Sequence, residues 1–155
     1  MLRDQTAADT FTEFARRCEP GLRRGLTAAF GSEVGREAAA DALVYGWQHW
    51  ERVERMANPS GYLFRVGQNK ARDMAGRFRW SSRAEVVFEE PWAEPGFGPA
   101  WKSLSDRQRT VIGLVHGFAW SLGEVADLLG VSKSSVQSHE QRGLKKLRRD
   151  LGVEG

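Results

Sequence analysis

The sequence has a single cysteine, Cys18, and no long apolar run. One cysteine excludes an internal disulfide and any zinc site built from several cysteines, and it is typical of a reducing compartment. The longest aliphatic stretch, residues 111–115, includes a glycine and is much shorter than the roughly 20 residues of a membrane-spanning helix. Residues 1–6 lack the apolar core of a signal peptide. We therefore expect a cytoplasmic protein without a membrane partner.

Clusters of reactive side chains are also lacking. His49, His116 and His139 fall in three different predicted helices, and no cysteine or carboxylate lies at metal-ligand spacing from them. There is no phosphate-cradling glycine loop and no nucleophile elbow. These absences argue against an enzyme, and we expect no metal, no cofactor and no small-molecule substrate.

Charge is distributed in three blocks. Residues 1–79 and 101–155 each carry a net charge of +3, whereas residues 80–100 carry −3. The basic excess of the last block is concentrated in residues 133–149. Acidic sequence thus separates two basic halves.

Helix breakers gather in the acidic block, where Pro91, Pro95 and Pro99 accompany two glycines. We interpret residues 81–100 as a linker between a domain at 1–80 and a domain at 101–155, and we expect a protease to cut within it. Before the linker, apolar residues recur at helical spacing, and Ser60 follows Asn58-Pro59 as a candidate cap for a last helix. With no alternating strand-like run, the predicted fold is all-α, with two small helical domains.

Three helix starts stand out after the linker. Ser105 with Gln108 and Ser121 with Glu124 have the spacing of capping boxes, and Ser132 can cap a third helix. Only residues 130–132 separate the last two helices, and Gly130 suits a left-handed turn. This spacing predicts a helix-turn-helix.

The exposed face of the second helix carries short or forked donors and acceptors that suit base edges and phosphates, and basic residues follow it. A plain three-helix domain with a solvated basic face is the alternative, but the compact turn, capped starts and basic continuation together favour DNA binding. The predicted duplex-binding residues are Lys133, Ser134, Ser135, Gln137, Ser138, His139, Arg142, Lys145 and Lys146.

Both halves resemble one protein family. LSDRQR at 104–109, SLGEVADLLGVS at 121–132, SVQS at 135–138 and RGLKKL at 142–147 resemble the carboxy-terminal domain of extracytoplasmic-function sigma factors. YLFRVGQNKARDMAGR at 62–77 fits the aromatic-Leu-x-x-aliphatic-small-x-Asn-x-x-x-Asp-x-x-Arg signature of their other domain. The matches span nearly the whole chain.

The resemblance implies a division of labour. The second domain would read the minus-thirty-five promoter element, and the first would grip the clamp of RNA polymerase and capture the melted minus-ten element. The implied partners are promoter DNA and core RNA polymerase, and an anti-sigma factor is a further candidate.

Melted DNA requires a basic groove with aromatic faces on which bases stack. Phe64 and Phe78 are alternatively core residues, and Asn69 alternatively holds backbone at a helix crossing. The predicted strand-binding residues are Asn58, Tyr62, Arg65, Asn69, Lys70, Arg72 and Arg77, with Trp80 as a further aromatic candidate.

Polymerase binding is assigned to Glu37, Asp41, Trp47 and Gln48. The family usually places an acidic-aliphatic-aliphatic-Gln motif on the clamp-binding helix, whereas this chain has EAAA at 37–40 and lacks the glutamine. A sigma-like regulator that binds DNA or a protein without starting transcription therefore remains the alternative function.

Overall fold

The structure, a computed structural model, describes residues 2–81 and 96–153; for residues 77–81 it describes the backbone only. Helices make up almost all of this part of the chain, which contains no strand, and the all-α prediction is confirmed. The N-terminal half consists of α1 (Leu2–Phe30), α2 (Ser32–Gln48), α3 (Trp50–Val53) and α4 (Pro59–Ser81), and the C-terminal half of α5 (Phe97–Lys102), α6 (Asp106–Ile112), the π-helix η1 (Gly113–Gly117), α7 (Leu122–Leu129) and α8 (Lys133–Asp150).

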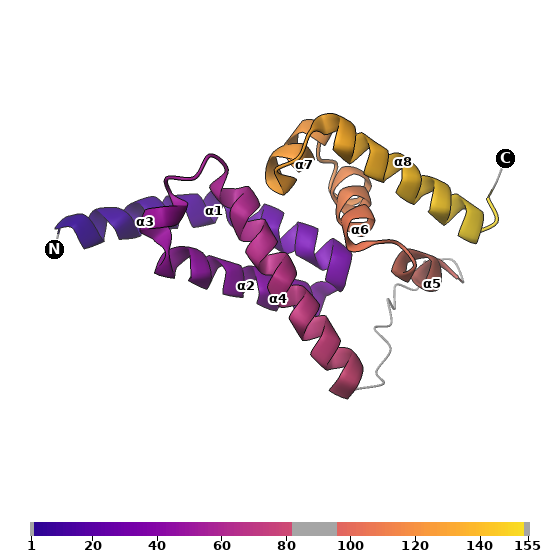
Figure 1. Cartoon of the computed structure of the whole chain (residues 1–155), viewed down its shortest axis with the longest axis horizontal. Coiled ribbons are helices and arrows are strands. Elements are labelled where there is room, and N and C mark those ends of the chain that lie inside the picture. Colours follow the sequence, from indigo (N-terminus) through magenta and orange to yellow (C-terminus); the bar gives the residue numbers. More distant parts are fainter. Residues whose placement is uncertain (1, 82–95, 154–155) are drawn as a thin grey trace.

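α1 and α2 form an antiparallel hairpin, and α4 crosses both of them (Figure 1). The two helices are joined at Gly31, whose φ of 91° lies in a region that glycine enters without a Cβ penalty. α1 continues through Pro20 and buries Leu22 and Leu26 beneath the other helices. The apolar periodicity of the first 50 residues therefore belongs to one long helix and its return helix.

The start of α4 differs from the sequence prediction. The side chain of Asn58 accepts hydrogen bonds from the backbone N–H of Gly61 and from the hydroxyl of Ser60. Asn58 is thus the cap, and Pro59 takes the first helical position, where its missing N–H costs nothing. The assignment of the cap to Ser60 was wrong by two residues.

The local predictions for the C-terminal half are confirmed at three helix starts. Ser105 with Gln108 and Ser121 with Glu124 form reciprocal capping boxes, and the Ser132 hydroxyl accepts from the N–H of Ser135. The helical region begins earlier than residue 101, however, because residues 97–100 belong to α5. Ala100 and Trp101 of α5 are buried against Leu147 of α8.

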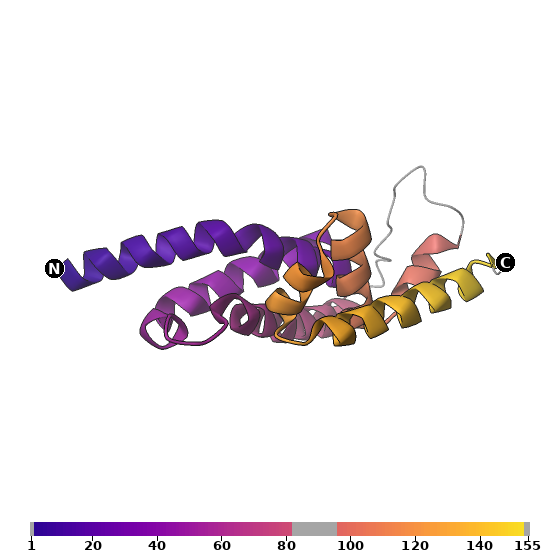
Figure 2. The same ribbon diagram turned by 90° about the horizontal axis from the view of Figure 1, so that it is seen from above.

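The two halves pack against each other. α6 and η1 lie against α1, and α7 lies against α4 (Figures 1 and 2). One core cluster contains Leu22 and Phe64 from the N-terminal half together with Val111 and Leu129 from the C-terminal half. The division of the chain by a linker at 81–100 stays a prediction. The structure adds that the two halves share one hydrophobic core.

None of the helices in residues 2–81 and 96–153 combines the length and the apolar character that crossing a membrane requires.

Candidate nucleic-acid interface

The helix-turn-helix is built from α7 and α8. α7 ends at Gly130, whose φ of 68° is left-handed, and α8 begins directly after the cap Ser132. Leu129 and Val136, on either side of the turn, are buried in the core. This packing fixes the angle of α8 and leaves its opposite face to solvent.

The outward face of α8 carries the predicted duplex-binding residues. Only part of the surface of Ser135, His139 and Lys146 is accessible, because these residues lie nearer the protein. The exposed members are Lys133, Ser134, Gln137, Ser138, Arg142 and Lys145. One helix face thus presents hydroxyl, amide and guanidinium groups together, in the first three turns after a helix N-terminus.

Two adjacent lysines at the far end of this face differ in their surroundings. The Nζ of Lys146 donates to the backbone oxygen of Ser103, 2.5 Å away, at the end of α5. Lys145 points to solvent and makes no such bond. Lys145 is therefore the freer of the two to neutralise a phosphate.

Positive charge also collects where α6 meets α8 and α4. Burial, followed by the charges of Arg107 and Arg142, lowers the pKa of His139. Burial, followed by the charges of Arg65 and Arg72, lowers the pKa of the Arg107 guanidinium. His139 is accordingly neutral near pH 7, one ring nitrogen donating and the other accepting.

The candidate strand-binding residues lie at the start and along the middle of α4. Arg65 and Asn69 are exposed, and Lys70 is partly exposed. Arg72 pairs with Asp106 of α6 at 3.0 Å. Phe64 is fully buried and touches Gly25, which favours its core interpretation. The side chains of Arg77, Phe78 and Trp80 lie outside the described residues.

Tyr62 belongs to a polar aromatic cluster that the sequence did not predict. Its hydroxyl lies 3.2 Å from that of Tyr45, and the guanidinium of Arg52 donates to both, at 2.6 Å to Tyr45 and 3.3 Å to Tyr62. Hydrogen bonding between the two hydroxyls lowers the pKa of Tyr45 and raises that of Tyr62. The cluster fixes the Tyr62 ring at the surface beside the loop that precedes α4.

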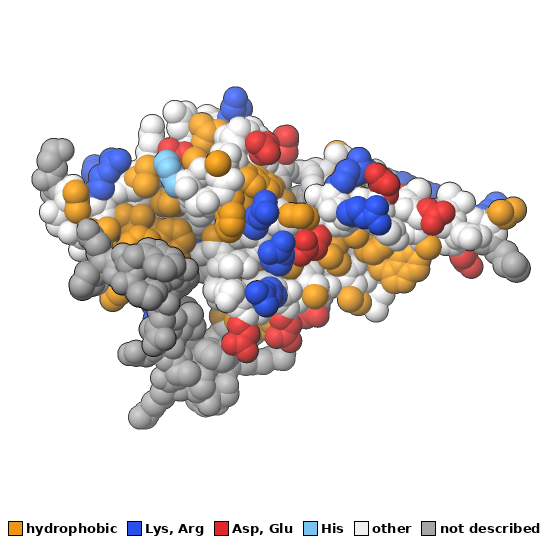
Figure 3. All heavy atoms as spheres, turned by 180° about the vertical axis from the view of Figure 1, so that it is seen from behind, with side chains coloured by type: hydrophobic (Ala, Val, Ile, Leu, Met, Phe, Trp, Pro, Cys, Tyr) orange, Lys and Arg blue, Asp and Glu red, His pale blue; other side chains and the backbone are white. Residues whose placement is uncertain are grey.

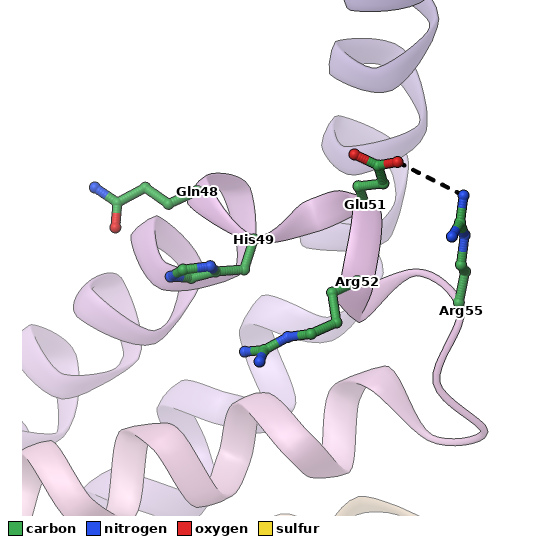
Figure 4. Close-up of a pocket in the computed structure, with 5 residues that line it drawn as sticks. All are labelled: Gln48, His49, Glu51, Arg52 and Arg55. Atoms are coloured by element: carbon green, nitrogen blue, oxygen red, sulfur yellow. Dashed lines mark ion pairs between the residues drawn. The ribbon is translucent and has the colours of Figure 1, made fainter.

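A pocket of about 500 Å³ opens beside this cluster, lined by Gln48, His49, Glu51, Arg52 and Arg55. His49 and Arg52 point to the same side of it, and Glu51 and Arg55 are joined by an ion pair (Figure 4). His49 also packs on the Tyr45 ring, with centroids 4.3 Å apart. Gln48 and His49 were candidates from sequence for the polymerase-binding surface, whereas Glu51, Arg52 and Arg55 were not, because the turn between α2 and α3 brings them there.

The candidate polymerase-binding residues follow the outer side of α2. Glu37 and Gln48 are exposed, Asp41 is partly exposed, and Trp47 leaves 46% of its surface accessible. Trp47 packs on Phe11 of α1, whereas its neighbour Trp50 is buried and donates to the hydroxyl of Thr10. One tryptophan is thus a core residue and the other is available to a partner.

Positive and negative side chains are mixed on the face of the molecule that points away from the viewer in Figure 1. Figure 3 shows Lys and Arg side chains interspersed with Asp and Glu and with hydrophobic side chains. Such a face does not produce a field of one sign. Among the described residues no group of three His, Cys, Asp or Glu could hold a metal ion.

Two comparisons with known proteins bear on this geometry. The family model of Sigma-70, region 4 matches residues 100–149, which cover α6, α7, almost all of α8 and the end of α5. The sigma factor RpoE of Bartonella quintana, solved in a co-crystal with the anti-sigma factor NepR, matches with a TM-score of 0.60 and 20% sequence identity. That similarity covers 94% of this chain and 99% of the RpoE chain. None of the curated proteins matches the sequence.

The C-terminal third is therefore a sigma-70 region 4 domain, and the chain as a whole has the fold of a sigma factor. The family-model match confirms the resemblance predicted from the motifs at 104–147, whereas the motif at 62–77 lies outside the matched residues.

Proposed function

We propose that this protein is a sigma factor of the extracytoplasmic-function type that directs RNA polymerase to its promoters. In this proposal α8 reads the minus-thirty-five element as duplex. α4 and the loop before it bind the melted minus-ten strand, and α2 binds the clamp of core polymerase.

The observation that supports the proposal is that one chain exposes two different sets of candidate nucleic-acid-binding residues. The α7–α8 unit exposes Gln137 and Arg142 on a rigid helix, a geometry that suits base edges in the major groove. The start of α4 instead combines the Tyr62 ring with Arg65 and Lys70, a combination that suits an unpaired strand. A protein that only bound duplex DNA would have no use for the second surface.

An anti-sigma factor is proposed as a further partner. The RpoE structure that shares the fold was solved with such a protein bound. Val44 and Trp47 are exposed apolar side chains on α2, and Phe118 is exposed on the C-terminal half. Both halves therefore offer apolar surface that a regulatory protein could cover.

The alternative function, a DNA-binding regulator that does not initiate transcription, is favoured by one observation. Ala40 stands where the resembled family has the glutamine of its clamp-binding motif. Asp41 and Gln48 remain accessible on the same helix, and we assign polymerase binding to them together with Trp47.

Footprinting on genomic DNA with and without core RNA polymerase tests the proposal. A sigma factor should protect both promoter elements together only when core polymerase is present. Protection of the same sites by the protein alone, unchanged by polymerase, would establish the regulator instead.

A further inference from the structure

Arginines from both halves of the chain gather around the start of α6. Arg65 and Arg72 lie on the same face of α4, because seven residues make two helical turns and a rise of about 10 Å. Arg72 pairs with Asp106, the first residue of α6, at 3.0 Å. Arg107, the next residue along α6, is therefore held close to α4.

Two further contacts bring α8, and the turn that precedes it, to the same place. A Cβ on Gly143 of α8 would lie 3.3 Å from the Cβ of Gln108, in the first turn of α6. His139 lies one turn before Gly143 on α8 and is partly buried. Beside α4, a Cβ on Gly130 would lie 3.6 Å from Nη2 of Arg65. Side chains of α4, α6 and α8 thus meet at one surface.

The charges at this surface act on one another. After burial, which is the larger cause, the charges of Arg65 and Arg72 lower the pKa of Arg107. Burial likewise comes first for His139, and the charge of Arg107 then lowers the pKa of that ring. Like charges held near one another raise the free energy of the surface, and a bound anion offsets that repulsion.

One carboxylate does not neutralise these arginines. Within the described part of the chain, Asp106 is the only ion-pair partner of Arg65, Arg72 and Arg107, and only Arg72 engages it. Asp106 is also shared with Arg109 at 2.7 Å. Three guanidinium groups around one carboxylate leave two positive charges, even before the share that Arg109 takes. A complementary ligand therefore carries at least two negative charges.

We propose that a small ligand with two linked phosphate groups binds to this arginine cluster, which consists of Arg65, Arg72, Arg107 and His139. Guanidinium groups donate paired hydrogen bonds to phosphate oxygens, and a neutral imidazole supplies a further donor. Each phosphate group carries at least one negative charge near pH 7. Arg107 is only partly exposed, which favours a compact anion over a DNA duplex. The site goes beyond the proposed function, since it requires neither polymerase nor promoter.

Arg107→Gln tests the site most directly, because Arg107 belongs to neither set of candidate DNA-binding residues. Glutamine removes the charge and keeps a polar side chain, and the helices should persist because a like-charge repulsion is relieved. Arg65→Gln is the second variant, which removes a charge from the other half of the chain. Arg148→Gln is the matched control: Arg148 is exposed on α8 and forms no ion pair within the described residues.

Isothermal titration calorimetry of the full chain with pyrophosphate measures the affinity, with ionic strength held constant by chloride. Orthophosphate is the comparison ligand. Thermal unfolding with and without pyrophosphate is a second readout, because a ligand that binds the folded state raises the Tm. Circular dichroism checks the helices of each variant, and Arg65→Gln alone decides if Arg107→Gln has lost them.

We expect one pyrophosphate per chain, bound at least roughly tenfold more tightly than orthophosphate, because the second phosphate adds charge-assisted hydrogen bonds. Arg107→Gln and Arg65→Gln should each weaken pyrophosphate binding by roughly tenfold and reduce the shift in Tm. Arg148→Gln should bind pyrophosphate like the wild type.

Three results would overturn the proposal. The first is a wild-type chain that binds pyrophosphate no more tightly than orthophosphate. The second is an equal loss in Arg148→Gln, which would show a general attraction to basic surface. The third is unchanged pyrophosphate binding in Arg107→Gln together with a smaller salt dependence of duplex binding, which would assign Arg107 to the DNA backbone. None of them bears on promoter recognition, which is tested with polymerase.

Discussion

Arg72 of α4 and Asp106 of α6 form an ion pair in which Nε and Oδ2 are 3.0 Å apart, although 34 residues separate them in the chain. Asp106 also accepts from Arg109 of its own helix at 2.7 Å. One carboxylate therefore joins α4, which carries the candidate strand-binding residues, to α6 of the C-terminal half.

Replacing Asp106 by asparagine should lower the free energy of unfolding by about 1 kcal/mol, because it removes two partly exposed ion pairs and a favourable charge in the first turn of α6. Urea denaturation measures the change. Glu51→Gln is the control: its pair with Arg55 is longer, at 3.7 Å, and more than 70% exposed on both sides. Equal losses in the two variants would contradict the linking role of Asp106.

Lys145 and Lys146 should respond differently to replacement by alanine. Lys145→Ala should reduce the slope of log affinity for duplex DNA against log salt by about 1, since one phosphate contact is lost. Lys146→Ala should change that slope less and should lower thermal stability, because Lys146 bonds to Ser103. Titrations at several salt concentrations distinguish the two variants. A larger change of slope for Lys146→Ala than for Lys145→Ala would refute the assignment.

Gln137→Ala tests direct readout of a base. Gln137 is exposed near the start of α8, where residues of a recognition helix reach base edges. Its loss should cost roughly 1 to 3 kcal/mol on the best duplex site, which has to be selected first, and little on random duplex. Equal losses on the two would assign Gln137 to the DNA backbone.

The features that could be predicted from sequence are those set by neighbours along the chain. Both capping boxes, the Ser132 cap and the left-handed Gly130 each depend on residues within a few positions, and all were correct. Residues 97–100 were predicted to belong to the linker, because three prolines and two glycines lie in that segment. They belong to α5 instead, whose Ala100 and Trp101 are buried against α8.

Contacts between distant segments could not be predicted. Nothing in the sequence near Gly21 indicates that Trp120 will lie on it, and the joining of Arg52 to Tyr45 and Tyr62 depends on where α3 turns. The candidate site residues were chosen by residue type and spacing. Their accessibility and their engagement by the other half follow only from tertiary packing.

Trp47→Ala should weaken binding to core RNA polymerase by roughly 1 to 3 kcal/mol, because exposed tryptophans that a partner buries are frequent hot spots. Binding of a fluorescent derivative to purified core enzyme measures the loss. Phe118→Ala is the matched control, since Phe118 is similarly exposed, at 43%, but lies on the other half beside Arg24. A larger effect at Phe118 would move the polymerase contact away from α2.

Promoter melting tests the central claim most directly. The full chain and core RNA polymerase are incubated with a duplex selected for binding to both, and permanganate then detects unpaired thymines. We predict reactive thymines near the minus-ten position only when chain and core enzyme are both present, and a reduced signal for Lys70→Ala with duplex binding by α8 nearly unchanged, because the two surfaces lie on different halves. A chain that binds this duplex and core polymerase yet never produces reactive thymines would contradict the assignment as a sigma factor.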